Sequence, residues 1–405
     1  MSSRKALPIL FLTILLDMVG IGMIIPILPI IFTDPASSSF LLLGYSKQAQ
    51  FIIAGAVTAL AGIMTFLAAP ILGEFSDLYG RKKLLTICIG ILAISQIFFG
   101  LGILLSSLWI LFISRAIAGL AGANISIAQA SIADITEPKN RAKNFGLIGV
   151  AVGIGFILGP ALGGSLASLT HSASIPFFVA GILGVINLIL VTFFLSETHE
   201  VPESKLHNIT IFKALHNIRS AFTGKESSHL YISSFFYLTG FTFFTSSTGI
   251  FLVQKFGLTE GNLGTYFGVL GVWIVITQGF ILRVITKKYS EKQILKFSLI
   301  GVALAIALMP FAPSTIFIYI LLPFIAVPQG LSMANMSALI SKSVHPSKQG
   351  AAMGINGSLS ALAQGVVPAI AGGITALLGI SFPYFIAGLC ILFSWKNLFL
   401  KKTIA

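Results

Sequence analysis

Charged residues are scarce in this chain. They make up 9% of its 405 residues, while hydrophobic residues make up 56%, and an average soluble domain carries about 25% charged residues. The mean hydropathy is +0.98. Because a soluble surface needs charge, this composition excludes a soluble enzyme, a secreted disulfide scaffold and a nucleic-acid-binding domain.

Cysteine and histidine are also scarce. The two cysteines, Cys88 and Cys390, both lie in apolar runs, where they are expected to pack rather than to form a disulfide or bind a metal. The six histidines lie in loops or at the ends of apolar runs. The sequence shows no zinc-ligand cluster, P-loop or nucleophile–base constellation. We therefore expect no enzymatic activity, no metal site and no cofactor.

Long apolar runs recur along the whole chain, and about 20 apolar residues suffice for a helix to cross a membrane. The chain is therefore predicted to be an all-α integral membrane protein with twelve transmembrane helices. The predicted spans are 6–32, 48–72, 84–105, 108–136, 144–168, 174–196, 229–254, 261–285, 292–311, 314–341, 350–378 and 381–398.

The positive residues give an orientation. The net charge is +13, and Lys and Arg gather in one set of loops together with both chain ends. The exceptions are Lys47 and Lys255, in the opposite loops, and Arg115, inside a span. Because loops rich in Lys and Arg stay in the cytoplasm, both termini are predicted to be cytoplasmic, in the inner (plasma) membrane.

The chain also looks duplicated. Its longest polar interruption, 197–228, separates residues 1–196 from residues 229–405, and each half holds six predicted spans. Glycine and proline positions recur at an offset of 208 residues: Pro138 with Pro346, Gly146 with Gly354, Gly149 with Gly357, Pro160 with Pro368, and Gly164 with Gly372. Parallel repeats of this kind are typical of transporters. We predict two pseudo-symmetric six-helix bundles joined by a cytoplasmic linker; a channel is the alternative.

The predicted cytoplasmic loop after the second span carries Gly73, Asp77, Gly80 and Arg81 in the pattern Gly-x-x-x-Asp-x-x-Gly-Arg. This pattern resembles the loop motif of the major facilitator superfamily. Gly80 permits a tight turn, and Arg81 can pair with Asp134 at the end of the fourth span.

Asp77 can accept hydrogen bonds from a helix N-terminus. The resemblance identifies that helix as the eleventh span, near Gly350, so the loop is expected to tie the two bundles together. In the second half Arg283 stands where the Asp would be, so this latch is expected to be asymmetric.

The fifth span carries Gly155, Gly159, Pro160, Gly163 and Gly164. They resemble the motif that marks antiporters of the same superfamily. Glycines four residues apart let helices approach closely, and Pro160 removes a backbone donor and bends the helix. The resemblance implies a tight seal that favours exchange over leak; generic helix packing is the alternative.

One face of the fourth span is polar, because Arg115, Gly119, Gly122, Ser126 and Gln129 recur at helical spacing. The Arg-x-x-x-Gly at its start resembles another motif of the superfamily. Such a polar stripe is expected to face a cavity rather than lipid.

Asp17 is the one carboxylate deep in a predicted span, and Arg115 is the one deep cation. Asp17 lies roughly 17 Å from the inner edge and Arg115 roughly 10 Å from the outer edge, in a core about 30 Å thick. They are therefore expected at similar depth, where they could face each other. Asp17 would then load and release a proton while Arg115 adjusts its proton affinity; a static buried pair is the alternative.

The first span, with Asp17, Gly20, Pro26 and Pro29, resembles the first-helix motif of the twelve-span drug:proton antiporters. The stretch 131–146 is similar to the tetracycline-efflux branch of that family. That branch typically carries an acidic residue in span three, where this chain has Ile94, and a histidine in span eight, where it has Ile274. Both departures argue against tetracycline itself as the cargo.

Aromatic walls with a few polar groups suit amphipathic organic molecules. The residues predicted to line a substrate cavity are Gln129, Tyr237, Phe241, Asn335, Asn356 and Gln364.

The resemblance implies a monomer in the lipid bilayer that exports a small drug-like compound in exchange for protons. The proton gradient would be its energy source, and nucleic acid is not an expected partner. The alternatives are a dedicated exporter of an endogenous metabolite such as a siderophore, and a proton-coupled nutrient importer.

Overall fold

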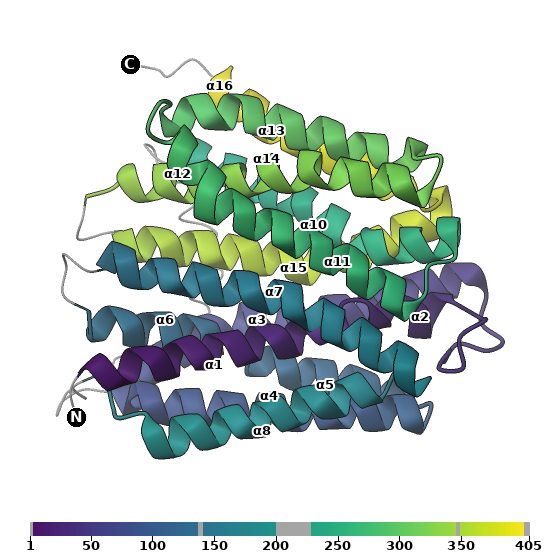
Figure 1. Cartoon of the computed structure of the whole chain (residues 1–405), viewed down its shortest axis with the longest axis horizontal. Helices are drawn as coiled ribbons and strands as arrows, with labels where there is room; N and C mark the ends of the chain where they lie inside the picture. Colours follow the sequence, from purple (N-terminus) through teal and green to yellow (C-terminus); the bar gives the residue numbers. More distant parts are fainter. Residues whose placement is uncertain (1–2, 137–140, 200–227, 346–348, 401–405) are drawn as a thin grey trace. The chain divides into compact units, whose positions relative to one another are not determined.

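The computed structural model describes residues 3–136, 141–199, 228–345 and 349–400. Most of the predicted linker 197–228, together with Pro138 and Pro346, lies outside the described residues. Within the described ranges every regular element is helical (Figure 1).

Twelve helical segments of the described chain are long and apolar enough to cross a membrane, which confirms the predicted fold class. The helices are α1 (Ser3–Ile24), α2 (Ile27–Thr33), α3 (Lys47–Tyr79), α4 (Arg81–Leu104), α5 (Leu108–Leu120), α6 (Asn124–Asp134), α7 (Arg141–Thr170), α8 (Ile175–Phe194), α10 (Ser228–Phe256), α11 (Glu260–Ile276), α12 (Leu282–Ile285), α13 (Glu291–Leu308), α14 (Thr315–Lys342), α15 (Gln349–Leu378) and α16 (Phe382–Phe399).

Three of the spans are interrupted. The first consists of α1 and α2, which meet at Pro26, a residue without a backbone N–H. The fourth consists of α5 and α6, with a break over residues 121–123. The eighth passes from α11 through the π-helical turn Thr277–Ile281 into α12. An interrupted membrane helix needs other partners for its freed backbone groups. At the break in the fourth span, Thr65 Oγ1 of α3 donates to the Gly119 carbonyl at 3.1 Å.

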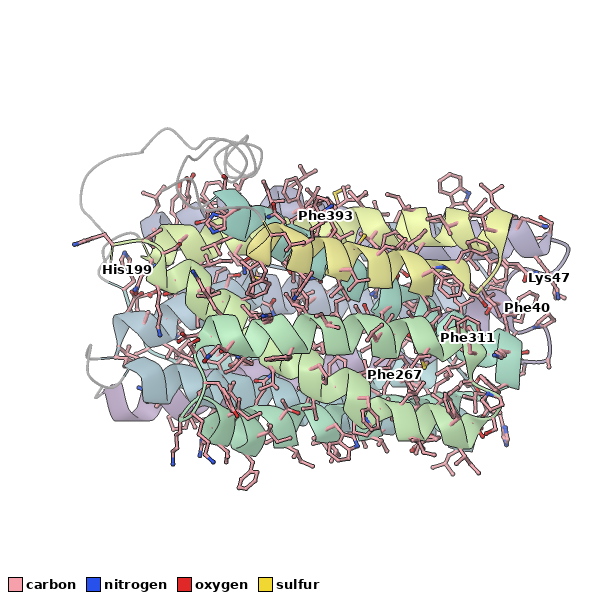
Figure 2. All side chains as sticks on the ribbon, turned by 90° about the horizontal axis from the view of Figure 1, so that it is seen from above. Phe40, Lys47, His199, Phe267, Phe311 and Phe393 are labelled. Carbon is pink, nitrogen blue, oxygen red and sulfur yellow. The ribbon has the colours of Figure 1, made fainter. Side chains whose placement is uncertain are left out.

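Large apolar side chains project outward along the helices (Figure 2). Phe193 is 76% exposed and Leu377 is 84% exposed. Such an apolar surface is unfavourable in water and favourable among lipid tails.

Contacts divide the chain into two compact units. Unit 1 comprises Met1–Gly44, Ile63–Lys213 and Leu258–Gly271, and unit 2 comprises Tyr45–Gly62, Ala214–Gly257 and Val272–Ala405. Each unit thus holds most of one predicted half. The start of α3 belongs with unit 2, however, and most of α11 belongs with unit 1.

The two units are built on the same pairings. In unit 1, α1 packs on α7 and α8, and α4 packs on α5 and α8. In unit 2, α10 packs on α15 and α16, and α13 packs on α14 and α16. The pairing of the first span with the fifth in unit 1 corresponds to the pairing of the seventh span with the eleventh in unit 2. The other pairs correspond in the same way. This internal correspondence agrees with the glycine and proline repeat in the sequence.

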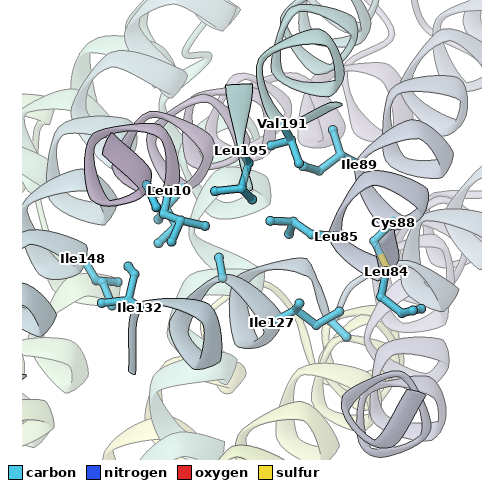
Figure 3. Packing of buried hydrophobic residues seen from close by; sticks show 14 of the residues in the cluster. Leu10, Leu84, Leu85, Cys88, Ile89, Ile127, Ile132, Ile148, Val191 and Leu195 are labelled. Atoms are coloured by element: carbon cyan, nitrogen blue, oxygen red, sulfur yellow. The ribbon is translucent and has the colours of Figure 1, made fainter. Parts of the chain in front are cut away.

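A cluster of buried aliphatic side chains holds the helices of unit 1 together (Figure 3). It joins Leu10 of α1, Leu85 of α4, Ile127 of α6, Ile148 of α7 and Val191 of α8. These helices also carry Asp17 and Arg81, so the cluster fixes the frame of both sites described below.

Candidate functional site

Arg81 is the centre of a charged cluster at the start of α4. Its side chain is 11% exposed. Its Nε donates to Asp134 Oδ2 at 3.0 Å, its Nη1 donates to Ser76 Oγ at 2.6 Å, and its Nη2 pairs with Asp77 Oδ1 at 2.5 Å. The loop motif thus brings a guanidinium, two carboxylates and a hydroxyl together from α3, α4 and α6.

The predicted pairing of Arg81 with Asp134 is confirmed by this geometry. Gly80 has φ +96°, a backbone conformation that favours glycine, as its place in a tight turn predicts. A Cβ added at Gly73 would meet no atom within 4 Å, so this structure shows no packing reason for a glycine there. The predicted tie of Asp77 to the start of the eleventh span would join the two units, and it stays a prediction.

Glu197, just after α8, completes this cluster and was not expected from the sequence. Its Oε1 accepts from the backbone N of Arg81 at 2.9 Å, and its Oε2 accepts from that of Lys82 at 3.2 Å. A carboxylate at a helix N-terminus satisfies free N–H groups and meets the positive end of the helix dipole. A Cβ at Gly80 would lie 3.0 Å from the Glu197 Cδ, so glycine there also makes room for this cap.

His199 stands beside the cluster, near one end of the helices of unit 1, while Phe40 lies near the opposite end (Figure 2). The His199 Nδ1 is 3.6 Å from Asp134 Oδ2. The cluster therefore gathers residues from the end of α3, the start of α4, the end of α6 and the segment after α8.

Unit 2 has an ion pair at the corresponding place, with the charges reversed. Glu291, at the start of α13, pairs with Lys342, at the end of α14. In unit 1 the cation begins α4 and the carboxylate ends α6. The Glu291 and Lys342 side chains are 28% and 66% exposed, so the pair contributes at most about 1 kcal/mol. The sequence predicted asymmetry from Arg283, which is exposed, but it did not predict this pair.

Asp17 lies inside α1 and is bonded to two amides. The Asn187 Nδ2, from α8, donates to Asp17 Oδ1 at 2.9 Å. The Asn124 Nδ2, from α6, donates to Asp17 Oδ2. Among the described residues no cation lies within ion-pair distance of this carboxylate.

Arg115 does not face Asp17, so the predicted pairing of these two residues is wrong. Its Nη2 donates to Gln96 Oε1 at 3.2 Å, and its guanidinium lies over the ring of Phe99, 4.3 Å from the centroid. Phe99 in turn stacks on Phe177 at 4.4 Å. The Arg115 Nε is buried and has no hydrogen-bond partner in the described part of the chain.

The error has a physical reason. The first and fourth spans are 28 and 27 residues long, which is about 40 Å of helix and more than a core of about 30 Å. Depths counted from opposite edges of the membrane therefore do not place Asp17 and Arg115 at the same level. Asp17 is level with Asn124, which lies about nine residues, or roughly 13 Å, along the fourth span from Arg115.

The glycines of the fifth span form a close-packed face toward α1. A Cβ at Gly159 would lie 2.6 Å from the Gly22 Cα, and one at Gly163 would lie 2.6 Å from the Met23 Cα. Gly155 meets Met18 in the same way. α7 continues as one helix through Pro160. The motif thus brings two backbones into contact, as predicted for glycines at this spacing.

The last glycine of the motif, Gly164, packs elsewhere within unit 1. A Cβ there would lie 2.9 Å from the Cα of Gly264, in α11. Within unit 2, a Cβ at Gly372 would lie 3.2 Å from the Cα of Gly55, in α3. Gly164 and Gly372 are one of the repeat pairs found in the sequence, and each meets a glycine of another helix.

The predicted cavity residues divide by burial. Tyr237 is 2% exposed and donates to the Gln329 carbonyl at 3.1 Å, and Asn335 is 2% exposed and donates to the Leu331 carbonyl at 2.7 Å. The Tyr237 bond joins α10 to α14, whereas the Asn335 bond lies within α14. Both side chains are buried in this structure, and their contact with a transported molecule stays a prediction.

The other candidates are more accessible. Gln129 and Phe241 are half-buried, and the half-buried Asn356 accepts from Ser234 Oγ at 2.6 Å. Gln364 is exposed and donates to Ser360 Oγ at 3.0 Å. These four remain candidates for contact with a transported molecule.

Twelve apolar helices, two units with the same internal pairing and a carboxylate, Asp17, inside a span are typical of a membrane transporter. A family model described as Major Facilitator Superfamily matches residues 10–368. The chain therefore belongs to the Major Facilitator Superfamily.

Named relatives agree with this assignment. The chain is 30% identical over 370 residues to the tetracycline resistance protein, class C, of Escherichia coli, covering 89% of this chain and 87% of that protein. It is 27% identical over 388 residues to multidrug resistance protein 2 of Bacillus subtilis (strain 168), covering 94% and 91%. The protein is thus a multi-pass membrane transporter and not an enzyme.

Solved structures share the fold. The human organic anion transporter MFSD10 (TETRAN) aligns with a TM-score of 0.74 over 98% of this chain and 99% of that chain. The sequence identity is 22%, so this likeness concerns the fold alone.

Proposed function

We propose that this transporter exports small amphipathic organic compounds in exchange for protons, by alternating access, with Asp17 as the proton-binding residue. The observation that carries the proposal is the setting of Asp17. A carboxylate inside a membrane span is costly unless its charge is compensated, and both of its oxygens here meet neutral amides. Taking up a proton removes the charge.

The separation of Arg115 from Asp17 supports the role of Asp17 as the proton-binding residue. A carboxylate held by a fixed guanidinium would form a neutral pair without a proton. Asp17 has no such partner among the described residues, so proton binding is the simple way to neutralise it. Arg115 then acts through Gln96 and Phe99, as a fixed charge inside unit 1.

The relatives support the proposed cargo and direction of transport. The similar proteins include a tetracycline resistance protein and a multidrug resistance protein, so a drug-like organic compound is the proposed cargo. Span three offers Gln96, bonded to Arg115, beside the exposed Ile94. That arrangement supports a cargo other than a metal-chelated tetracycline.

The membrane setting belongs to the same proposal. The Arg81 cluster lies on the side that the Lys-rich and Arg-rich loops assign to the cytoplasm. There it would serve as the gate that stabilises one facing of the transporter. The protein would work as a monomer in the inner membrane, driven by the proton gradient.

The test is a susceptibility panel in an efflux-deficient host, covering dyes, antibiotics and tetracycline. It compares wild type, Asp17→Asn and empty vector, with Asp34→Asn as the control that removes a carboxylate from a loop. We expect resistance from wild type and Asp34→Asn, and none from Asp17→Asn at equal expression. Resistance retained by Asp17→Asn would contradict the role of Asp17. No resistance from well-expressed wild type would instead favour a dedicated exporter of an endogenous metabolite.

A further inference from the structure

The two amides that hold Asp17 differ in what else they bind. Asn187 is fully buried, and its Nδ2 donates to the main-chain carbonyl of Thr13 at 3.2 Å as well as to Asp17 at 2.9 Å. Asn124 is 2% exposed, and its Nδ2 donates to Asp17 Oδ2. The first amide is therefore anchored at a second point on α1, and the second amide is not.

This difference decides how each amide responds to a proton. A carboxylate only accepts hydrogen bonds, whereas a protonated carboxyl also donates one and needs an acceptor. An amide can supply either group, because a half-turn of its side chain exchanges its nitrogen for its oxygen. A half-turn of Asn187 would place its oxygen against the Thr13 carbonyl oxygen and break a bond. A half-turn of Asn124 breaks no bond except the one to Asp17.

The exchange of amide nitrogen for oxygen matters because buried polar atoms near Asp17 already lack partners among the described residues. The Asn187 Oδ1 and the Thr13 Oγ1 are buried without a partner in the described part of the chain. An unpaired buried polar atom is destabilising, so a further unsatisfied O–H on Asp17 would add to an existing cost. Cys88, buried on α4, is the titratable side chain beside Asp17 among the described residues, and α7 faces this part of α1 with Gly155.

We propose that Asn124 is the positioning residue that follows the proton on Asp17, while Asn187 is a fixed donor in both protonation states. A proton carried by water adds to Asp17 Oδ2 and forms an O–H bond, and water is left behind. Asn124 then turns its amide so that its Oδ1 accepts from this O–H. The inference rests on the proposed function, because it requires that Asp17 binds a proton.

Asn124 is well placed for this movement. It is the first residue of α6, directly after the break in the fourth span. Its amide therefore stands at a helix start, and the half-turn needs no change in the α-helical hydrogen bonds of α6.

The experiment is infrared difference spectroscopy of the full-length protein in proteoliposomes after a pH jump, so it needs no cargo. The C=O band of protonated Asp17 is assigned by its loss in Asp17→Asn. Asn124→Leu removes the acceptor at similar size, and Asn124→Thr restores a group that both donates and accepts. Asn187→Leu removes the fixed donor.

Asn397→Leu is the matched control. Asn397, in α16 of unit 2, also donates twice, to the His229 carbonyl and to Ser233 Oγ, both at 2.9 Å. This variant loses the same kind of helix tie far along the chain from Asp17, so it reports any spectral change due to weakened packing.

The expected result is a C=O band that moves to higher wavenumber in Asn124→Leu, because the carboxyl no longer donates, and that returns toward wild type in Asn124→Thr. Asn397→Leu leaves the band in place. A band that titrates normally but does not move in Asn124→Leu would overturn this inference and leave the proposed function standing. No band sensitive to Asp17→Asn at any pH would instead overturn the proposed function.

Discussion

The two carboxylates that bind Arg81 should contribute unequally to stability, and a double-mutant cycle can measure the difference. The perturbations are Arg81→Gln with Asp134→Asn, and Arg81→Gln with Asp77→Asn. Each cycle isolates one pair, since the other partner remains in all four proteins. Asp→Asn keeps the size of the side chain. Arg81→Gln shortens it, but this loss is common to the single and the double variant and cancels in each coupling energy.

The magnitudes follow from exposure. The Asp134 side chain is 24% exposed and meets an Arg81 side chain that is 11% exposed. A hydrogen bond to a charged group in such a setting contributes about 1.5–3 kcal/mol. The Asp77 side chain is 56% exposed, and an exposed ion pair typically contributes about 0.2–1 kcal/mol. We therefore expect the coupling of Arg81 with Asp134 to be at least about 1.5 times that with Asp77.

The assay is the free energy of unfolding in mixed detergent micelles titrated with a denaturing detergent, repeated at low and high salt. The coupling with Asp77 should shrink at high salt, because exposed charges are screened, while that with Asp134 should persist. Equal couplings, or a larger one for Asp77, would refute the argument that burial determines the strength of these pairs.

Three further predictions concern other contacts. Glu197→Gln should lower the free energy of unfolding by about 0.3–1 kcal/mol, because the charge at the start of α4 is lost; no change at low salt would contradict the capping role. Gly159→Ala should lower the unfolding temperature measured by thermal shift, while Gly373→Ala, with open space at its Cβ, should not; equal effects would argue against close packing of α7 on α1. Exchanging the charges of Glu291 and Lys342 should change the unfolding free energy by less than about 1 kcal/mol; a larger loss would show that this exposed pair matters more than its exposure implies.

The fold could be predicted from the sequence because the apolar runs, the linker and the repeat all indicate the same architecture. Apolar runs of sufficient length predict spans, and the linker with its repeat offset predicts two equivalent sets of six. The structure shows those spans and the same helix pairings in both units. The partition is the exception, because 45–62 and 258–271 group with the opposite half, and the order of residues along the chain does not reveal such packing.

The charged cluster could be predicted only in part. Arg81 and Asp134 follow from spacing and from the ends of spans. Glu197 was missed because it is 116 residues from Arg81 and belongs to no pattern around the motif. The available signal was its type and place, since the whole chain has 12 acidic residues and this one follows the sixth span on the predicted cytoplasmic side.

The surroundings of Asp17 could not be predicted from charge alone. Pairing the lone deep carboxylate with the lone deep cation, Arg115, ignored neutral groups, and the amides of Asn124 and Asn187 are its actual partners. Interrupted spans longer than the membrane core also make depth a poor guide to contact. An asparagine inside an apolar span needs a partner, and that requirement was the missed signal.

The most direct test of proton-coupled export is transport into everted membrane vesicles, with ethidium and tetracycline as separate probes. An imposed pH gradient, acidic inside, should drive accumulation of at least one probe by wild type and by Asp34→Asn, and a proton carrier should collapse it. Asp17→Asn at equal abundance should accumulate neither probe. Gradient-driven accumulation by Asp17→Asn equal to wild type, or wild-type accumulation that survives the proton carrier, would contradict the account.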